Sequence, residues 1–121
     1  MTQSQTIVVN NESDIVMLRM QVRDLARSVG LNLADQARIS LAASSVVKAI
    51  GLGITRHGKI TMDSCQSEDR VGVRIVCTEE NGSDQHSAPP SLGETRWMVD
   101  ELTLETLPHD RLQVTLVKWR A

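Results

Sequence analysis

The sequence has almost no aromatic residues, with two Trp, no Phe and no Tyr among 121 residues. A domain of this length must therefore build its core from aliphatic side chains, and a hydrophobic content of 40% is enough to fill one. RNA-binding modules that stack bases on aromatic side chains are disfavoured by the same shortage.

Cysteine is also scarce, and the sequence has neither an excess of positive charge nor a long apolar run. Cys65 and Cys77 are too few for a disulfide framework, and in regular strands they would lie on opposite sheet faces, which disfavours a bridge between them. A formal net charge of −2 argues against a nucleic-acid or membrane binder. No apolar run approaches transmembrane length, and the polar start does not resemble a signal peptide. We therefore expect a cytoplasmic protein that binds neither nucleic acid nor membrane.

Groups of residues that could hold a metal or form a nucleophile are missing as well. His57, His86 and His109 fall in predicted turns far apart in the chain, with no Cys or His at ligand spacing. No grouping of Ser, His and an acid stands out in a chain this rich in Ser. We expect no metal site and no hydrolytic site.

The first half of the chain carries the pattern of a short strand followed by two helices. The strand is expected at residues 6–9, and the first helix is expected to begin within Asn10, Asn11 and Glu12 and to end at Gly30. Its apolar residues recur at helical spacing, at Ile15, Leu18, Val22, Leu25, Ala26 and Val29. Asn32 can cap the second helix, with Asp35 in its first turn. The buried stripe of that helix would be Ile39, Ala42, Ala43, Val46 and Ile50.

The second half predicts four strands and one short helix. The strands are expected at 59–66, 71–78, 102–107 and 112–119, and the helix at 92–99. A tight turn over SEDR joins the first strand pair, and Pro108, His109 and Asp110 form the turn of the second. The polar segment 81–91 is expected to be irregular, and mobile over 83–91. This order predicts an α+β fold, with residues 1–121 as a single domain. Its architecture would be a two-layer α/β sandwich, with a mixed, mainly antiparallel sheet and helices on one face.

Two segments of the chain are similar to one known family. DIVMLRMQVRDLARSVGLNLADQARISLA, residues 14–42, resembles the opening helix pair of the RsbT-type and RsbW-type switch-protein serine kinases and anti-sigma factors. MVDELTLETLPHDRLQVTLVKWR, residues 98–120, resembles their terminal hairpin with its Lys-Trp close. The resemblance covers nearly the whole chain. It implies the Bergerat, histidine-kinase-like ATPase (GHKL) fold that this family shares with gyrase, the ninety-kilodalton chaperone and histidine kinases.

The resemblance also implies a nucleotide site, but the residues that such a site needs are replaced. In the family, the helix that corresponds to residues 41–50 carries a Glu that activates the attacking group and, four residues later, an Asn that ligates magnesium. Residues four apart share a helix face, and by position these slots hold Ser44 and Lys48. Ser44 has no carboxylate, and Lys48 would place an ammonium where the cation should bind.

The family's adenine-binding motif D-x-G-x-G is altered in the same way. By position this sequence offers Glu79, Glu80, Asn81, Gly82 and Ser83, so that two glycines are replaced by residues with a Cβ. The Gly-rich turn that wraps the phosphates is reduced to Gly93. The expected site is a degenerate nucleotide cleft without catalytic residues, comprising Ser44, Lys48, Glu79, Gly82 and Gly93.

Arginine recurs at intervals of four on the first helix, at Arg19, Arg23 and Arg27. Such a stripe is either a solvated surface or a docking site for an acidic partner, since guanidinium groups suit carboxylates. The resemblance favours docking, because the relatives bind their switch proteins partly through this region.

The sequence therefore predicts an RsbT-like regulatory protein of a bacterial partner-switching pathway that acts by protein binding, with little or no ATP binding or kinase activity. No cofactor is expected, although residual binding of ATP and magnesium stays open. The partner would be a STAS-domain switch protein, a regulatory phosphatase or a sigma factor, and a homodimer is also open. The alternatives are an active serine/threonine kinase that phosphorylates a STAS-domain protein through Glu79 or Glu80, and an anti-sigma factor.

Overall fold

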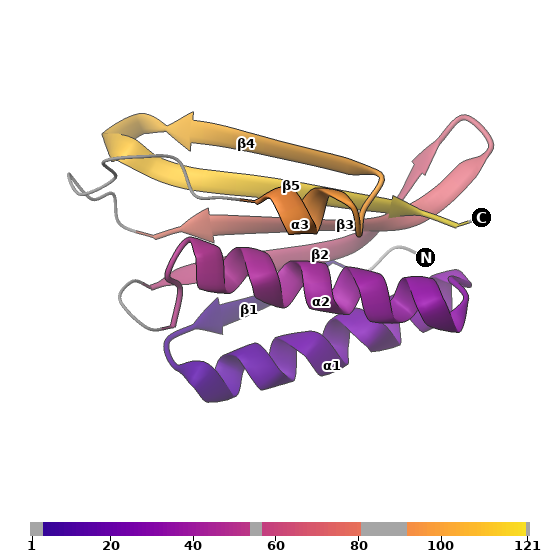
Figure 1. Ribbon diagram of the computed structural model, residues 1–121, viewed down its shortest axis with the longest axis horizontal. Helices are drawn as coiled ribbons and strands as arrows, with labels where there is room; N and C mark the ends of the chain where they lie inside the picture. Colours follow the sequence, from indigo (N-terminus) through magenta and orange to yellow (C-terminus); the bar gives the residue numbers. More distant parts are fainter. Residues whose placement is uncertain (1–3, 54–56, 81–91, 121) are drawn as a thin grey trace.

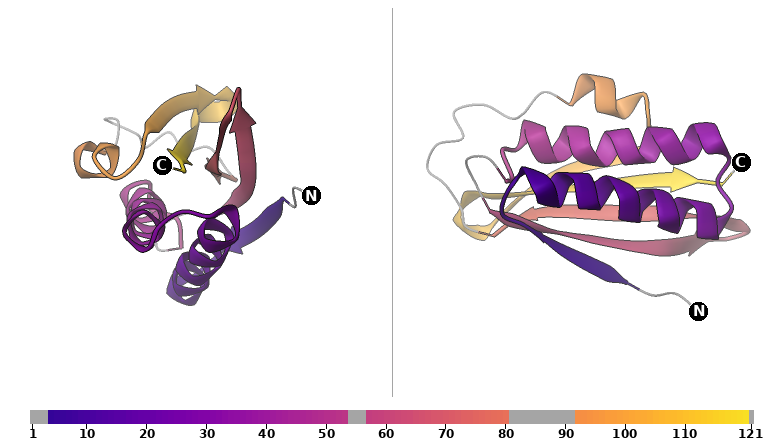
Figure 2. Two further views of the ribbon diagram at one scale, coloured as in Figure 1. Left: turned by 90° about the vertical axis from the view of Figure 1, so that its right-hand side faces the viewer. Right: turned by 90° about the horizontal axis from the view of Figure 1, so that it is seen from below.

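The computed structural model describes residues 4–53, 57–80 and 92–120. Within these ranges, a five-stranded sheet carries its helices on one face (Figures 1 and 2), which confirms the predicted fold class. The elements in chain order are β1 (Gln5–Val9), α1 (Glu12–Val29), α2 (Leu33–Ala49), β2 (Gly58–Ser67), β3 (Arg70–Glu79), α3 (Gly93–Arg96), β4 (Glu101–Leu107), a 3-10 turn (Pro108–Asp110) and β5 (Arg111–Trp119).

The strands are arranged in the order β1-β2-β3-β5-β4, and all four pairings between them are antiparallel. The expectation of a mixed sheet is therefore wrong for the described strands. Two antiparallel helices connect β1 to β2, so β2 runs opposite to β1 and pairs with it directly. The connection through α3 makes β4 run in the same direction as β3, but β5 lies between them and pairs antiparallel with both.

Both long helices begin with an Asn cap, α1 at Asn11 within the predicted helix entry and α2 at the predicted Asn32. The Asn11 side chain accepts a hydrogen bond from the Asp14 backbone, and the Asp14 carboxylate accepts one from the Asn11 backbone, which makes a capping box. Helix α1 ends at Gly30, whose φ of 99° lies in the left-handed region. Asn32 accepts from the Asp35 backbone at 2.8 Å and starts α2.

The core is aliphatic and lies between the helix pair and the inner face of the sheet. The helices contribute Leu18, Val22, Ile39 and Val46, which are fully buried. The strands contribute a matching set of fully buried side chains, namely Val9, Ile60, Met62, Val73, Ile75, Cys77, Val114 and Leu116. No described helix is both long enough and apolar enough to cross a membrane.

The largest differences from the predicted elements lie in the second half of the chain. Helix α3 has four residues and not the eight expected, and the chain continues from Trp97 to Asp100 as turns and bends. Strands β2 and β3 extend further into SEDR, which leaves only Glu68 and Asp69 in the turn, with Glu68 at a φ of 56°. The segment 81–91, with the mobility expected for 83–91, lies outside the described residues.

The two cysteines lie on opposite faces of the sheet, as expected. Cys77 is fully buried on the inner face, and burial raises the pKa of its thiol to about 12. Cys65 lies opposite Gly72 on the outer face, where burial is the main cause that raises its pKa, while Arg74 acts in the opposite direction.

This contrast predicts selective thiol labelling. Because the thiolate is the nucleophile, a disulfide reagent should label Cys65 alone in the native protein, faster as the pH rises, and Cys77 only after unfolding. Counting the thiols labelled with and without denaturant tests this, with Cys65→Ser as the control that should remove the native reaction. Rapid labelling of two thiols in the folded protein would contradict the buried position of Cys77.

Candidate functional site

Helix α2 and strand β3 both end at the same end of the molecule (Figure 1), and the predicted cleft residues Lys48 and Glu79 belong to these two ends. Helix α2 lies between α1 and α3 in the helix layer, so one of its flanks faces α1 and the other faces α3 and β5. Only the second flank could line a cleft beside the end of β3.

Ser44 lies on the wrong flank of α2 for a cleft residue. The Ser40 hydroxyl donates to the backbone carbonyl of Arg19 in α1 at 3.2 Å, which fixes the flank that faces α1. Ser44 lies one turn further along that flank, is only 5% exposed, and donates to the Leu41 carbonyl. The predicted pairing of Ser44 with Lys48 in a cleft is therefore wrong, because Ser44 is part of the helix packing and Lys48 is exposed to solvent.

The opposite flank of α2 presents a different pair of residues four apart. Asp35 forms an ion pair with Lys118 of β5 at 3.6 Å, which identifies the flank that faces β5 and α3. Ala42 and Ala49 follow Asp35 at intervals of seven residues and so share its side of the helix, with Ser45 beside them. Ser45 and Ala49 are therefore the pair with the family's spacing on the side that could face a nucleotide. Neither has a carboxylate or an amide.

Glu79 ends β3 on the inner face of the sheet, and its carboxylate is bound within the protein. The residue is fully buried, and Oε1 accepts a hydrogen bond from the backbone N–H of Leu112 at 2.6 Å. This bond ties the end of β3 to the start of β5. The structure thus places Glu79 near the predicted cleft but directs an oxygen into the sheet.

The two remaining residues of the predicted cleft, Gly82 and Gly93, add no further support for a nucleotide site. Gly93 begins α3 and is exposed, and a Cβ at this position would meet no heavy atom within 4 Å outside its chain neighbours, so packing does not require a glycine there. Gly82 lies outside the described residues. Among the residues that the structure does describe, no group of three or more His, Cys, Asp or Glu side chains could hold a metal ion.

The arginine stripe lies on the exposed surface of α1. Arg27 forms a 2.8 Å ion pair with Asp24 on the same helix, whereas Arg19 and Arg23 have no acidic partner in the described part of the chain. Val16 and Met20 lie beside them, 59% and 64% exposed. Val16 and Met20 form an apolar row along the helix, and Arg19 and Arg23 form a basic row next to it.

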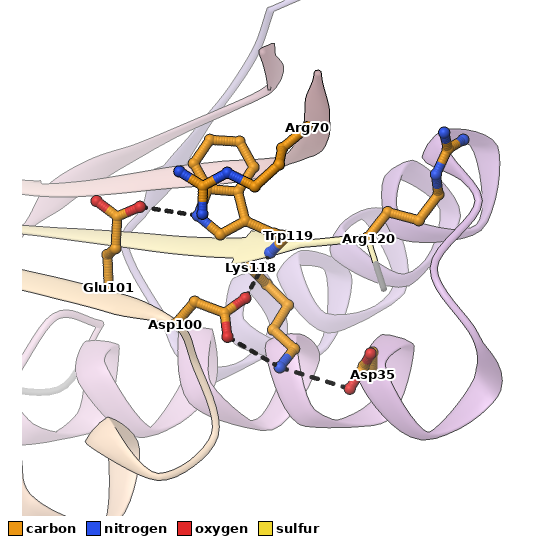
Figure 3. Close-up of a pocket in the computed structure, with 7 residues that line it drawn as sticks. All are labelled: Asp35, Arg70, Asp100, Glu101, Lys118, Trp119 and Arg120. Carbon is orange, nitrogen blue, oxygen red and sulfur yellow. Dashed lines mark hydrogen bonds and ion pairs between the residues drawn. The ribbon is translucent and has the colours of Figure 1, made fainter. Parts of the chain in front are cut away.

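A second site, which sequence reasoning missed, lies at the other end of the sheet. A pocket of about 350 Å³ is lined by α2, by the first residue of β3, by the start of β4 and by the end of β5 (Figure 3). The sequence offered one signal for it, the Lys118-Trp119 pair, but gave no reason to connect that pair with Asp35 or Arg70.

Comparison with known proteins agrees with this fold. No protein-family model matches the chain. It is 24% identical over 132 aligned residues to the serine/threonine-protein kinase RsbT of Bacillus subtilis (strain 168), and the alignment covers 98% of both proteins. The crystal structure of the RsbU and RsbW domains of Rv1364c from Mycobacterium tuberculosis matches 98% of the chain with a TM-score of 0.69 at 16% identity. The chain spans 33% of that longer protein. The chain is thus similar over its full length to RsbT, and it shares the fold of this solved structure.

Proposed function

We propose that this chain is a partner-switching protein that acts by binding another protein and transfers no phosphate. The observation that carries the proposal is the flank of α2 that faces β5 and α3. A member of this family that uses ATP needs a carboxylate to activate the attacking hydroxyl and an oxygen ligand for magnesium. Ser45 supplies only a hydroxyl, and Ala49 supplies no polar group.

The position of Glu79 supports the same proposal. In the family, the acid at this position accepts a hydrogen bond from the adenine amino group. Here the carboxylate would have to give up or share its 2.6 Å bond from Leu112, inside the sheet and away from water. A buried backbone N–H left without an acceptor costs about 1–3 kcal/mol, which would be subtracted from the binding free energy of any nucleotide.

The surface proposed for partner binding is the α1 stripe with its apolar row. Arg19 and Arg23 offer guanidinium groups that have no acidic partner within the described ranges, and Val16 and Met20 offer exposed apolar surface. An acidic surface with an apolar centre would complement both rows. A STAS-domain switch protein is the partner that the relationship to RsbT favours, and a regulatory phosphatase or a sigma factor is the alternative.

Phosphate transfer distinguishes this proposal from the alternative of an active kinase, which would phosphorylate a STAS-domain protein. Purified protein incubated with radiolabelled magnesium ATP and a STAS-domain protein from its own cell is expected to form no phosphoserine. RsbT of Bacillus subtilis with its own substrate serves as the positive control. Stoichiometric phosphorylation by the present chain would refute the proposal and return attention to Glu80, which is exposed next to Glu79.

Binding of nucleotide is tested separately from transfer. A ligand present at a hundred times its dissociation constant stabilises the native state by about 2.7 kcal/mol, which raises the melting temperature by several degrees. We expect no shift with millimolar magnesium ATP. The double variant Ser45→Glu, Ala49→Asn introduces a carboxylate and an amide on the flank that faces β5 and α3, and it is compared with the unmodified chain. The double variant Ser44→Glu, Lys48→Asn introduces the same two groups at the positions first predicted, and it serves as the control. A clear shift for the unmodified chain would show that a nucleotide still binds.

A further inference from the structure

The pocket at the far end of the sheet is built around Trp119. The indole Nε1 donates to Glu101 at 2.8 Å, and the backbone N–H of Trp119 donates to Asp100 at 2.7 Å. The ring lies against Gly72, where an added Cβ would come within 2.8 Å of the ring atom Cε3. Arg70 covers the ring, with its guanidinium carbon 4.3 Å from the ring centroid (Figure 3). The indole is therefore held in one orientation, and it holds Arg70 in turn.

The carboxylates that line the pocket are already engaged. Asp35 pairs with Arg38 at 2.8 Å and with Lys118 at 3.6 Å. Asp100 pairs with Lys118 at 3.5 Å and accepts from the Trp119 backbone. Glu101 accepts from the indole. Each acid thus has at least one close donor, and the two aspartates share the ammonium of Lys118 between them.

The basic side chains of the pocket have N–H donors that are not used in hydrogen bonds within the described residues. Within residues 4–53, 57–80 and 92–120, Arg70 makes no hydrogen bond or ion pair beyond its contact with the indole. Arg120 makes one long side-chain hydrogen bond, 3.4 Å to the Val29 carbonyl, and Lys118 reaches its two acids only at ion-pair distances. Three basic and three acidic residues line the pocket, and Arg38, bound to Asp35, adds a further positive charge.

We propose that this pocket binds a phosphate group, with Arg70 as its main ligand. A guanidinium stacked on an aromatic ring keeps its N–H groups free in its own plane, and that geometry suits two oxygens of an oxyanion. The indole fixes the direction of those donors in advance, so less side-chain entropy is lost on binding than for a free surface arginine. The site lies at the opposite end of the sheet from the predicted nucleotide cleft, and it does not depend on the proposed loss of phosphate transfer.

The chain allows a direct optical test, because it contains only two Trp. Trp97 follows α3 directly and is 89% exposed, so Trp97→Leu should fold normally and leave Trp119 as the only fluorophore. Inorganic phosphate is titrated into this variant at constant ionic strength, with chloride as the compensating ion. The expected result is a saturable change in Trp119 emission at millimolar phosphate.

The site is then tested by substitution. Arg70→Gln should weaken phosphate binding by about tenfold or more, because the charge and the planar donors are lost together. Arg96→Gln, an exposed change on α3 that does not touch the pocket, is the matched control and should leave binding unchanged. Thermal unfolding of both variants verifies that they fold, and Arg70→Lys, which keeps the charge without the planar fork, should bind with intermediate strength.

Two sources of the phosphate are distinguished by the same titration. Tighter binding of a phosphoserine peptide than of inorganic phosphate would assign the pocket to a phosphorylated side chain, and equal binding would assign it to the free ion. The proposal is overturned if phosphate changes the emission no more than chloride does, or if Arg70→Gln binds as well as Arg96→Gln.

Discussion

Replacing Glu79 with alanine is expected to lower the free energy of unfolding by about 3 kcal/mol, because the buried N–H of Leu112 loses an acceptor and a small cavity opens. Urea denaturation measures this change. Glu80→Ala is the matched control, since Glu80 is adjacent, exposed and should change stability by less than about 0.5 kcal/mol.

Two further variants at position 79 separate the effect of side-chain length from the effect of the charged carboxylate. Glu79→Gln keeps a side-chain oxygen of the right reach and should retain more stability than Glu79→Ala. Glu79→Asp restores the residue that the family uses, but it is one methylene shorter and should fail to reach Leu112 without strain. If Glu79→Ala proved as stable as Glu80→Ala, the carboxylate would have no structural role and could serve a ligand.

Replacing Arg23 with glutamate is expected to weaken binding of the partner protein by about 30-fold, which corresponds to about 2 kcal/mol. The reason is that Arg23 lies between Arg19 and Arg27 on the stripe and forms no ion pair with an acid in the described chain. Stability should barely change, since exposed charges contribute little to folding. The partner is first identified by affinity capture, and binding is then measured by calorimetry at two salt concentrations.

Arg38→Glu is a useful comparison for this measurement, because Arg38 is exposed on α2 but already paired with Asp35. Met20→Ala tests the apolar row separately, and its effect should not depend on salt. Equal affinity for the unmodified protein and Arg23→Glu at both salt concentrations would mean that the stripe is a solvated surface.

The sequence was sufficient to predict the elements whose signals are local. The apolar spacing from Ile15 to Val29, the helix entry at residues 10–12 and the cap at Asn32 predict α1 and the start of α2 correctly, because each depends only on residues within a few turns. The order of the strands was not predictable in the same way. The position of β5 between β3 and β4 depends on pairings between residues far apart in the chain, such as Ile75 with Leu116.

The orientation of α2 about its own axis was the main error in the predicted site. The stripe from Ile39 to Ile50 identifies the face toward the sheet, but it does not say which flank faces α1. Ser44 and Ser45 are chemically identical neighbours, so the sequence offered nothing to choose between them. The hydrogen bond from Ser40 to α1 and the ion pair of Asp35 with β5 decide the choice, and both are tertiary contacts.

The insertion of β5 between β3 and β4 also affects how the chain can fold as it is synthesised. Residues 111–119 pair with two strands at once, so β4 has no neighbour in the sheet until they are available. Until then one side of β3 is open as well, and the apolar residues Ile75 and Cys77 have no partner strand on that side. The hairpin of β2 and β3 can form early. A ribosome-bound chain that stops before Arg111 should, however, expose the unpaired edge of β3, which is prone to aggregation, and should depend on chaperones.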